Sequence, residues 1–235
     1  MKKKIVSIIL PAYNERENLL RLIPAILAEF SGSSEWNAEI LVVDDDSQDG
    51  TADVLRKRFS GKIRLIVRKH ERGLASAIAE GIRQSRGSTI LGMDADGNHD
   101  PRNIPALLSG LRSADLVVGS RFVTGGGMMW GIQCALSLVS NLILFHVFRF
   151  PVRDNTSGYY VIGKKRLTAL GTADIYQGYG DYHLRLVWLA KQAGLRIGEV
   201  PVRYAPRLHG QSKSRLSIML ITYIKTVLQL RWAKR

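Results

Sequence analysis

A run of alternating polar residues follows one apolar stretch of this sequence. In residues 89–101, TILGMDADGNHDP, the apolar run ends at Asp94, and Asp96 and Asn98 follow at alternate positions. Side chains two apart on an extended chain point the same way, so their oxygens can converge. Such oxygens suit a hard cation such as Mg²⁺, which keeps water and substrate phosphates on its remaining positions. A polar turn is the alternative interpretation, because Asp, Asn and Gly are common where strands end.

The composition favours a basic protein of a reducing compartment. Of 235 residues, 46% are hydrophobic, and the net charge of +14 favours polyanions such as nucleic acid, anionic lipid or phosphorylated small molecules. The single cysteine, Cys134, excludes an internal disulfide. No zinc-finger spacing or RNA-recognition signature is present, so we expect no nucleic-acid partner. The apolar stretch after the first lysines stops at Pro11, too early for a secretory signal, which favours the cytoplasm.

Short β-rich runs alternate with helical patterns through the first half of the chain. The sequence predicts strands over residues 5–10, 40–43, 63–67, 89–93 and 116–118, with helices over 17–30, 51–58, 74–84 and 104–111. This alternation predicts an α/β fold with a parallel sheet covered by helices on both faces. Ligands of such sheets bind at the carboxyl ends of strands, where Asn14, Asp45 and Asp94 lie. No G-x-G-x-x-G follows the first strand and no Walker A motif is present, which argues against dinucleotide and P-loop enzymes.

Residues 128–148 form a long segment without Asp, Glu, Lys or Arg. The length alone would allow it to span a bilayer. However, Gln133, Ser137, Ser140 and Asn141 recur at spacings of three to four, which places them on one helical face. A polar stripe on an apolar helix favours an element that lies in a membrane interface or packs against a groove.

A second apolar segment, residues 216–230, carries one charge, Lys225, and has basic residues such as Lys213 and Arg231 on either side. Basic residues that border an apolar helix fit attachment to an anionic membrane surface. For both segments the alternative is burial in the core of the domain itself.

Eight motifs occur in one order along the chain. They are PAYNE at 11–15, VVDDDSQDGT at 42–51, GLASA at 73–77, DAD at 94–96, GSR at 119–121, DNTSG at 154–158, GEVP at 198–201 and RLHGQSKS at 207–214. With these motifs the sequence resembles the family 2 glycosyltransferases of GT-A fold, and within them the dolichyl-phosphate mannose synthase branch. The resemblance covers nearly the whole chain. It implies a single domain with a Rossmann-like, mostly parallel sheet and amphipathic interfacial helices, with a nucleotide-sugar half over 1–122, an acceptor half over 123–214 and a basic helix over 215–235.

The resemblance assigns the donor site residue by residue. Donor-binding roles fall on Pro11, Ala12, Tyr13, Glu15, Val43, Asp45, Ala77, Asp94, Ala95, Arg207 and Lys213. The last two lie on a basic loop that would close over the diphosphate. Asp45 would accept N–H groups from the edge of the base, since a carboxylate only accepts hydrogen bonds. Asp94, Asp96 and Asn98 would hold Mg²⁺ or Mn²⁺ against the diphosphate, and Asp96 is thereby a catalytic residue.

The resemblance also implies a polyprenyl phosphate acceptor. Such a phosphate is largely ionised at neutral pH, with a second pKa of about 6, and can attack the anomeric carbon without a strong base. Arg121 matches the phosphate-binding arginine of the family, as a catalytic and acceptor residue. Gln133 and Ser137 fall in the W-x(n)-R-x-x-x-S pattern that begins here at Trp130, but the uncharged Gln133 departs from its arginine.

A hydroxyl acceptor would instead need a general base, and Asp181 lies near the position of the catalytic carboxylate in inverting relatives. The alternative role for Asp181 is a charge at a helix N-terminus, where it interacts with the helix dipole.

These observations favour a metal-dependent inverting glycosyltransferase attached peripherally to the cytoplasmic face of a membrane. It would move a hexose, with mannose from GDP-mannose favoured, from a nucleotide-sugar donor onto a polyprenyl phosphate. One alternative uses a UDP-sugar and a lipid phosphate or saccharide hydroxyl. Another is a basic nucleotide- or nucleic-acid-binding module without catalysis, against which Asp94 and Asp96 argue. The oligomeric state is left open.

Overall fold

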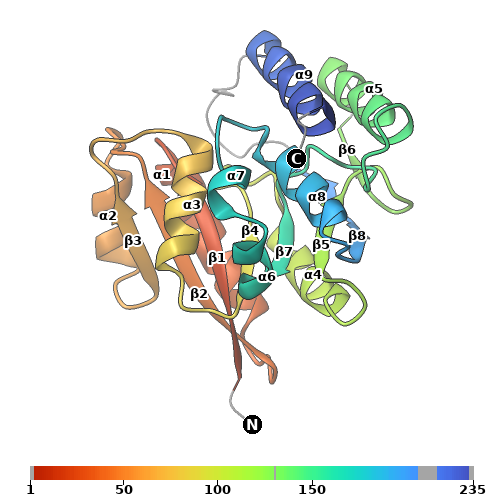
Figure 1. Ribbon diagram of the computed structural model, residues 1–235. Helices are drawn as coiled ribbons and strands as arrows, with labels where there is room; N and C mark the ends of the chain where they lie inside the picture. Colours follow the sequence, from red (N-terminus) through yellow and green to blue (C-terminus); the bar gives the residue numbers. More distant parts are fainter. Residues whose placement is uncertain (1–2, 130, 206–215, 233–235) are drawn as a thin grey trace.

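The structure is a computed structural model that describes residues 3–129, 131–205 and 216–232 (Figure 1). For Gln133 and residues 216–221 it describes the backbone only. The predicted donor residues Arg207 and Lys213 lie outside the described residues.

A seven-stranded sheet runs through the described part of the chain (Figure 1). In spatial order its strands are β3 (Ile63–Val67), β2 (Trp36–Asp44), β1 (Lys4–Ala12), β4 (Thr89–Gly92), β7 (Tyr160–Gly163), β5 (Leu116–Ser120) and β8 (Ile197–Pro201). Only β7 runs antiparallel to its neighbours, β4 and β5, among these strands. A small parallel pair joins β6 (Gly127–Met128) to β9 (Arg203–Tyr204). The mostly parallel α/β fold predicted from the sequence is therefore confirmed.

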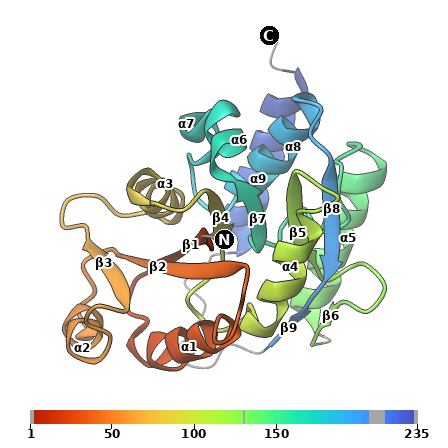
Figure 2. The same cartoon turned by 90° about the horizontal axis from the view of Figure 1, so that it is seen from below.

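Helices cover both faces of this sheet, because successive residues of a strand point to opposite sides. Ile8 of β1 packs with α1 (Arg16–Glu29), α2 (Thr51–Arg58) and α4 (Ile104–Gly110), the last preceded by the 3-10 turn η1 (Pro101–Asn103). Ile9 belongs to the buried cluster on the other face, which includes residues of α3 (Leu74–Gln84), α6 (Lys164–Ala169), α7 (Thr172–Ile175) and α8 (Tyr182–Gln192). Figure 2 shows α1 and α3 on opposite sides of β1 and β2.

The parallel strands β1, β2 and β4 bring their carboxyl ends to one edge of the sheet. Ala12 at the end of β1 pairs with Asp44 at the end of β2, and β4 flanks β1 on its other side. Gly92 ends β4, one residue before the predicted boundary, and a Cβ there would lie 2.4 Å from the ring of Tyr160 on β7. The glycine thus allows β7 to pack closely where the acidic loop begins.

Helix α5 (Ile132–His146) turns Asn141 of the polar stripe toward the protein and several of its apolar residues outward. Asn141 is 1% exposed, and its side chain bonds the backbone N–H of Asn155 and the Thr156 hydroxyl. On the outer side, Ile132 is 80% and Val139 is 52% exposed. Burial in the domain core, the alternative considered for this segment, is wrong for these apolar side chains.

Helix α9 (Leu216–Trp232) has a similar outer face. Thr226 and Val227 are buried, whereas Ile224, Leu228 and Trp232 are exposed. Figure 1 places α5 and α9 at the end of the molecule opposite the amino terminus. None of the helices in the described ranges has the length and apolarity needed to cross a membrane.

Candidate active site

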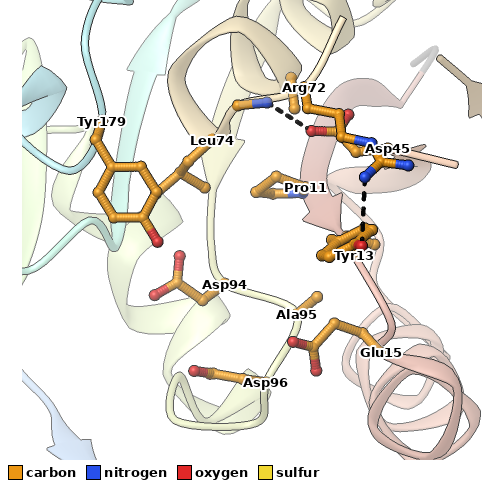
Figure 3. A pocket seen from close by; sticks show the side chains of 13 residues that line it. Pro11, Tyr13, Glu15, Asp45, Arg72, Leu74, Asp94, Ala95, Asp96 and Tyr179 are labelled. Carbon is orange, nitrogen blue, oxygen red and sulfur yellow. Dashed lines mark hydrogen bonds between the residues drawn. The ribbon is translucent and has the colours of Figure 1, made fainter. Parts of the chain in front are cut away.

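A pocket of about 420 Å³ opens at the carboxyl ends of β1, β2 and β4 (Figure 3). Its lining consists of Pro11, Ala12, Tyr13, Glu15, Asp45, Arg72, Gly73, Leu74, Ala77, Asp94, Ala95, Asp96 and Tyr179. The predicted donor residues within the described chain all line it except Val43, which is fully buried in β2. Arg72, Gly73, Leu74 and Tyr179 were not predicted as site residues. The pocket thus gathers residues from five separate stretches of sequence.

The carboxylate of Asp45 is held from two sides. Arg68 Nε donates to Asp45 Oδ1 at 2.7 Å, and the backbone N–H of Gly73 donates to Oδ2 at 2.8 Å. The side chains of Arg68 and Asp45 are each less than a tenth exposed, so their ion pair lies in a poorly solvated position. A carboxylate has about four acceptor positions, so Asp45 keeps capacity for a ligand in the pocket.

Sequence reasoning missed Arg68, because its role depends on which strand lies beside β2. The residue comes directly after β3, the strand beside β2, and its backbone N–H donates to Asp44 at 2.8 Å. A buried carboxylate at one strand end requires a cation nearby, and the neighbouring strand end is where that cation lies.

Tyr13 and Arg72 form one wall of the pocket. The Arg72 guanidinium lies 5.1 Å from the centre of the Tyr13 ring, and its Nη1 is 3.4 Å from the Tyr13 hydroxyl. Figure 3 shows this pair beside Asp45 and across the pocket from Tyr179. A guanidinium that lies over an aromatic ring is attracted to its face, so each side chain helps to hold the other in the wall of the pocket.

His99 fixes the backbone of the acidic loop. Its Nδ1 accepts the N–H of Asp94 at 2.9 Å, and its Nε2 lies 2.7 Å from the Tyr204 hydroxyl. The ring stacks on Tyr159 with centroids 4.7 Å apart. Burial lowers the pKa of His99 to about 4, against the opposing effect of the Asp96 charge. The ring is therefore neutral at physiological pH, which leaves Nδ1 as an acceptor for Asp94.

Asp96 is positioned by Asn98. The backbone N–H of Asn98 donates to Asp96 Oδ1 and its side-chain amide donates to Oδ2, both at 3.0 Å. Asn98 thus offers hydrogen-bond donors to Asp96 in this arrangement, and its role as an oxygen ligand stays a prediction. Asp96 is 6% exposed.

Asp94 and Asp96 provide a donor set that fits a divalent cation. Both line the pocket, and Figure 3 shows them on its same side. No group of three His, Cys, Asp or Glu side chains suited to a metal occurs in the described ranges. Mg²⁺ commonly takes one or two protein carboxylates and completes its sphere with water and phosphate oxygens. Two carboxylates at the mouth of a pocket meet that requirement.

Arg121 lies outside the pocket lining, in a buried ion pair. Its Nε and Nη2 each donate to Asp154 at 2.7 Å, and Nη2 also donates to the Thr156 hydroxyl at 2.8 Å. Burial alone would lower the pKa of Arg121, but the Asp154 charge outweighs burial and raises it. The same pairing lowers the pKa of Asp154 despite its burial. Nη1 faces the weak acceptor Met128 Sδ at 3.7 Å. Contact of Arg121 with an acceptor stays a prediction.

Asp181 is also outside the pocket lining. Its Oδ1 accepts the backbone N–H of Tyr179 at 2.9 Å, and its Oδ2 accepts from Thr226 at 2.8 Å and from Arg185 Nε at 3.2 Å. The side chain is 1% exposed and directly precedes α8. The structure gives Asp181 a bracing position, and its role as a base stays a prediction.

The other two predicted acceptor residues lie on α5. The carbonyl of Ser137 accepts from the Asn141 amide at 2.9 Å. The side chain of Gln133 is outside the described residues, and its backbone belongs to the first turn of α5. The structure therefore brings the predicted donor residues together, but it does not bring Ser137 into the same pocket.

Comparison with known structures supports the fold. Glucosyl-3-phosphoglycerate synthase from Mycobacterium tuberculosis, in complex with Mn²⁺, uridine diphosphate and glucosyl-3-phosphoglycerate, superposes with a TM-score of 0.73 at 22% identity. The match covers 97% of this chain and 80% of that protein. At this identity the likeness concerns the fold alone.

Comparison with known sequences identifies the family. The chain is 32% identical over 215 residues to the dolichol-phosphate mannosyltransferase of Pyrococcus furiosus, across 88% of this chain and 58% of that protein. It thus spans less than two thirds of that relative. The dolichol-phosphate mannosyltransferase of Saccharomyces cerevisiae is 31% identical over 230 residues, across 95% of this chain and 86% of that protein. The family model described as glycosyl transferase family 2 matches residues 7–165. The chain therefore belongs to glycosyl transferase family 2.

Proposed function

We propose that this protein is a metal-dependent inverting mannosyltransferase that moves mannose from GDP-mannose onto a dolichyl-type polyprenyl phosphate. The observation that carries the proposal is the placement of Asp94 and Asp96 at the strand end beside the pocket. The names of the yeast and Pyrococcus relatives supply the sugar and the acceptor.

In this proposal the nucleoside end of the donor occupies the wall formed by Tyr13, Arg72 and Asp45. The base lies against Tyr13 and Arg72, whose guanidinium lies 5.1 Å from the centre of the Tyr13 ring. Asp45 accepts N–H groups from the edge of the base, and Arg68 and Gly73 hold the carboxylate in place. Guanine presents an imino and an amino N–H on one edge, and Asp45 Oδ2, which accepts only from Gly73 among the described atoms, can accept one of them.

Asp94 and Asp96 hold Mg²⁺ or Mn²⁺ next to the donor diphosphate. When bound, the cation acts as a Lewis acid that offsets the charge on the departing nucleoside diphosphate. The chain's own contribution is positional. His99 fixes the Asp94 backbone, and Asn98 orients the Asp96 carboxylate, so that both are preorganised before a substrate arrives.

The acceptor phosphate attacks the anomeric carbon from the face opposite the leaving group. A phosphate oxygen forms the new C–O bond as the bond to the nucleoside diphosphate breaks, which inverts the anomeric centre. With a second pKa of about 6, the phosphate arrives largely ionised and no base has to remove a proton. Arg121, oriented by Asp154, directs the acceptor phosphate, and Asp181 then serves a structural role.

We place the reaction at the cytoplasmic face of a membrane. The exposed apolar side chains of α5 and α9 provide a surface that water solvates poorly, and Lys225 and Arg231 add positive charge on α9. A lipid phosphate held at such a surface presents its headgroup to the protein while its prenyl chain stays in the bilayer.

A donor panel tests this function. The protein is incubated with Mn²⁺ and each of several GDP- and UDP-sugars, with and without a polyprenyl phosphate, and nucleoside diphosphate release is measured. We expect release from GDP-mannose that increases on addition of the lipid phosphate. If UDP is released from a UDP-sugar in preference, the donor is a UDP-sugar and not GDP-mannose. If no nucleoside diphosphate is released from any donor, the proposed enzymatic activity is refuted.

A further inference from the structure

Tyr179 reaches the pocket from a loop far along the chain from the other lining residues. Its side chain is 39% exposed and lies beside Leu74 and Asp94. Figure 3 shows its hydroxyl pointing toward Asp94, across the pocket from Tyr13 and Glu15. An amphipathic ring thus faces the part of the pocket next to the acidic loop.

Gly178 and Asp181 determine the conformation of the loop that carries Tyr179. Gly178 has φ +74°, and a Cβ on it would lie 2.6 Å from Asp181 Oδ1. The same Oδ1 accepts the Tyr179 backbone N–H at 2.9 Å. A glycine is therefore required for the tight turn that points Tyr179 into the pocket.

Helix α9 holds this loop from behind. The Thr226 hydroxyl donates to Asp181 Oδ2 at 2.8 Å, and the Tyr223 hydroxyl donates to the Gly180 carbonyl at 3.3 Å. Thr226 and Asp181 are each 1% exposed, so water does not readily replace their hydrogen bond. A chain of contacts thus runs from α9 through Asp181 to Tyr179.

We propose that Tyr179 contacts the hexose of the donor, and that Thr226 and Asp181 are positioning residues that keep it there. The inference rests on the proposed function, in which the nucleoside lies at the Tyr13 wall and the diphosphate at Asp94 and Asp96. The hexose then extends past Asp94, on the side where Tyr179 lies. The ring packs against the C–H face of the sugar, and its hydroxyl bonds a sugar hydroxyl.

Binding measurements separate a sugar contact from a nucleotide contact. The parent protein is titrated by calorimetry, with Mn²⁺, against GDP and GDP-mannose and against UDP and UDP-glucose, and the pair that binds is used. For Tyr179→Ala we expect the Kd of the nucleotide sugar to rise about 10-fold, while the Kd of the nucleoside diphosphate changes less than about twofold. Tyr179→Phe should show a smaller change of the same kind.

The role of α9 is tested with Thr226→Val, which keeps the shape of the side chain but removes its hydroxyl. We expect the same selective loss of nucleotide-sugar affinity, and Thr226→Ser should bind like the parent. Thr168→Val is the matched control, because that exposed hydroxyl lies on α6 and bonds only the Lys164 carbonyl among the described atoms. Thr226→Val combined with Tyr179→Ala should bind no worse than Tyr179→Ala alone, since both act through one contact.

Each outcome decides one part of the inference. Equal loss of both ligands in folded Tyr179→Ala and Tyr179→Phe, or no loss in either, would overturn the sugar contact. Parent-like binding by Thr226→Val, or additive effects in the double variant, would overturn the role of α9. A parent protein that binds none of the four ligands would refute the proposed function itself and this inference with it. Thermal melting of every variant distinguishes local effects from unfolding.

Discussion

His99 Nδ1 accepts the backbone N–H of Asp94 at 2.9 Å, behind the loop that carries Asp94 and Asp96. The ring is fully buried and neutral, and it stacks on Tyr159. A loop that rests on a buried ring loses little conformational freedom when a ligand arrives. The His99 ring therefore supports the acidic loop on the side that faces away from the pocket.

The first prediction concerns the cation. Asp96→Ala should lower Mn²⁺-dependent transfer at least about 100-fold, because a bound cation supplies several kcal/mol of charge stabilisation. The fold should survive, since Asp96 lies beyond the end of β4. Steady-state rates and melting temperatures measure both effects. Asp53→Ala, which removes an exposed carboxylate on α2, is the control. Full activity in Asp96→Ala, or in excess chelator, would exclude the metal role.

The second prediction concerns the ion pair between Arg68 and Asp45. Arg68→Met leaves the Asp45 carboxylate buried without its cation, which should cost about 3–5 kcal/mol of the free energy of unfolding. Adding Asp45→Asn removes the charge and should recover a large part of that loss. Urea denaturation of the two variants measures it. If the double variant is less stable than Arg68→Met, the ion pair is not the cause.

The strand ends and their polar residues could be predicted from the sequence because they depend on local patterns. The alternation of apolar runs with helical periods placed Asn14, Asp45 and Asp94 at strand ends, and parallel pairing brings such ends together. Arg68 and Tyr179 could not be found this way. The position of Arg68 depends on which strand lies beside β2, and the position of Tyr179 depends on a loop that contacts α9.

The orientation of α5 could likewise not be predicted from the sequence. Periodicity separates a polar face from an apolar face, but it does not say which face meets the protein. Here Asn141 bonds Asn155 and Thr156, whose positions depend on β7 lying between β4 and β5. The insertion of an antiparallel strand into a parallel sheet has no local signal in residues 160–163.

The third prediction concerns the membrane surface. The protein should pellet with anionic vesicles, and high salt should weaken binding only partly, because apolar burial is not screened. Ile132→Glu combined with Ile224→Glu should reduce the bound fraction strongly, since a carboxylate is costly to place among lipid chains. Ser60→Glu adds one such charge at an exposed position next to α2 and should leave binding nearly unchanged, whereas either Ile→Glu change alone should lower it. A parent protein that stays in the supernatant with all vesicles would contradict interfacial attachment.

The fourth prediction concerns pH. His183 on α8 is 1% exposed, and burial lowers its pKa from 6.5 to about 4, against the opposing charge of Asp154. The unfolded chain therefore binds a proton that the folded chain does not between these two values. The part of the free energy of unfolding that depends on His183 is at its maximum above about pH 6.5. It decreases by about 1.4 kcal/mol per pH unit as the pH falls toward 4.

Urea denaturation at several pH values checks this effect. His183→Leu should reduce the slope of unfolding free energy against pH by about one proton in that window. His70→Gln, at an exposed position, is the control and should leave the slope unchanged. An unchanged slope in His183→Leu would show that His183 is not a source of the acid sensitivity.

The most direct test of the central claim is to identify the lipid product. The protein is incubated with GDP-mannose, Mn²⁺ and dolichyl phosphate in vesicles, and the organic phase is analysed by mass spectrometry and by NMR of the anomeric carbon. We predict one hexose on the lipid phosphate, with β configuration from the α-linked donor, and none with Asp96→Ala. Recovery of unmodified lipid phosphate while GDP-mannose is bound or hydrolysed would contradict transfer, and a product with retained configuration would contradict direct attack by the phosphate.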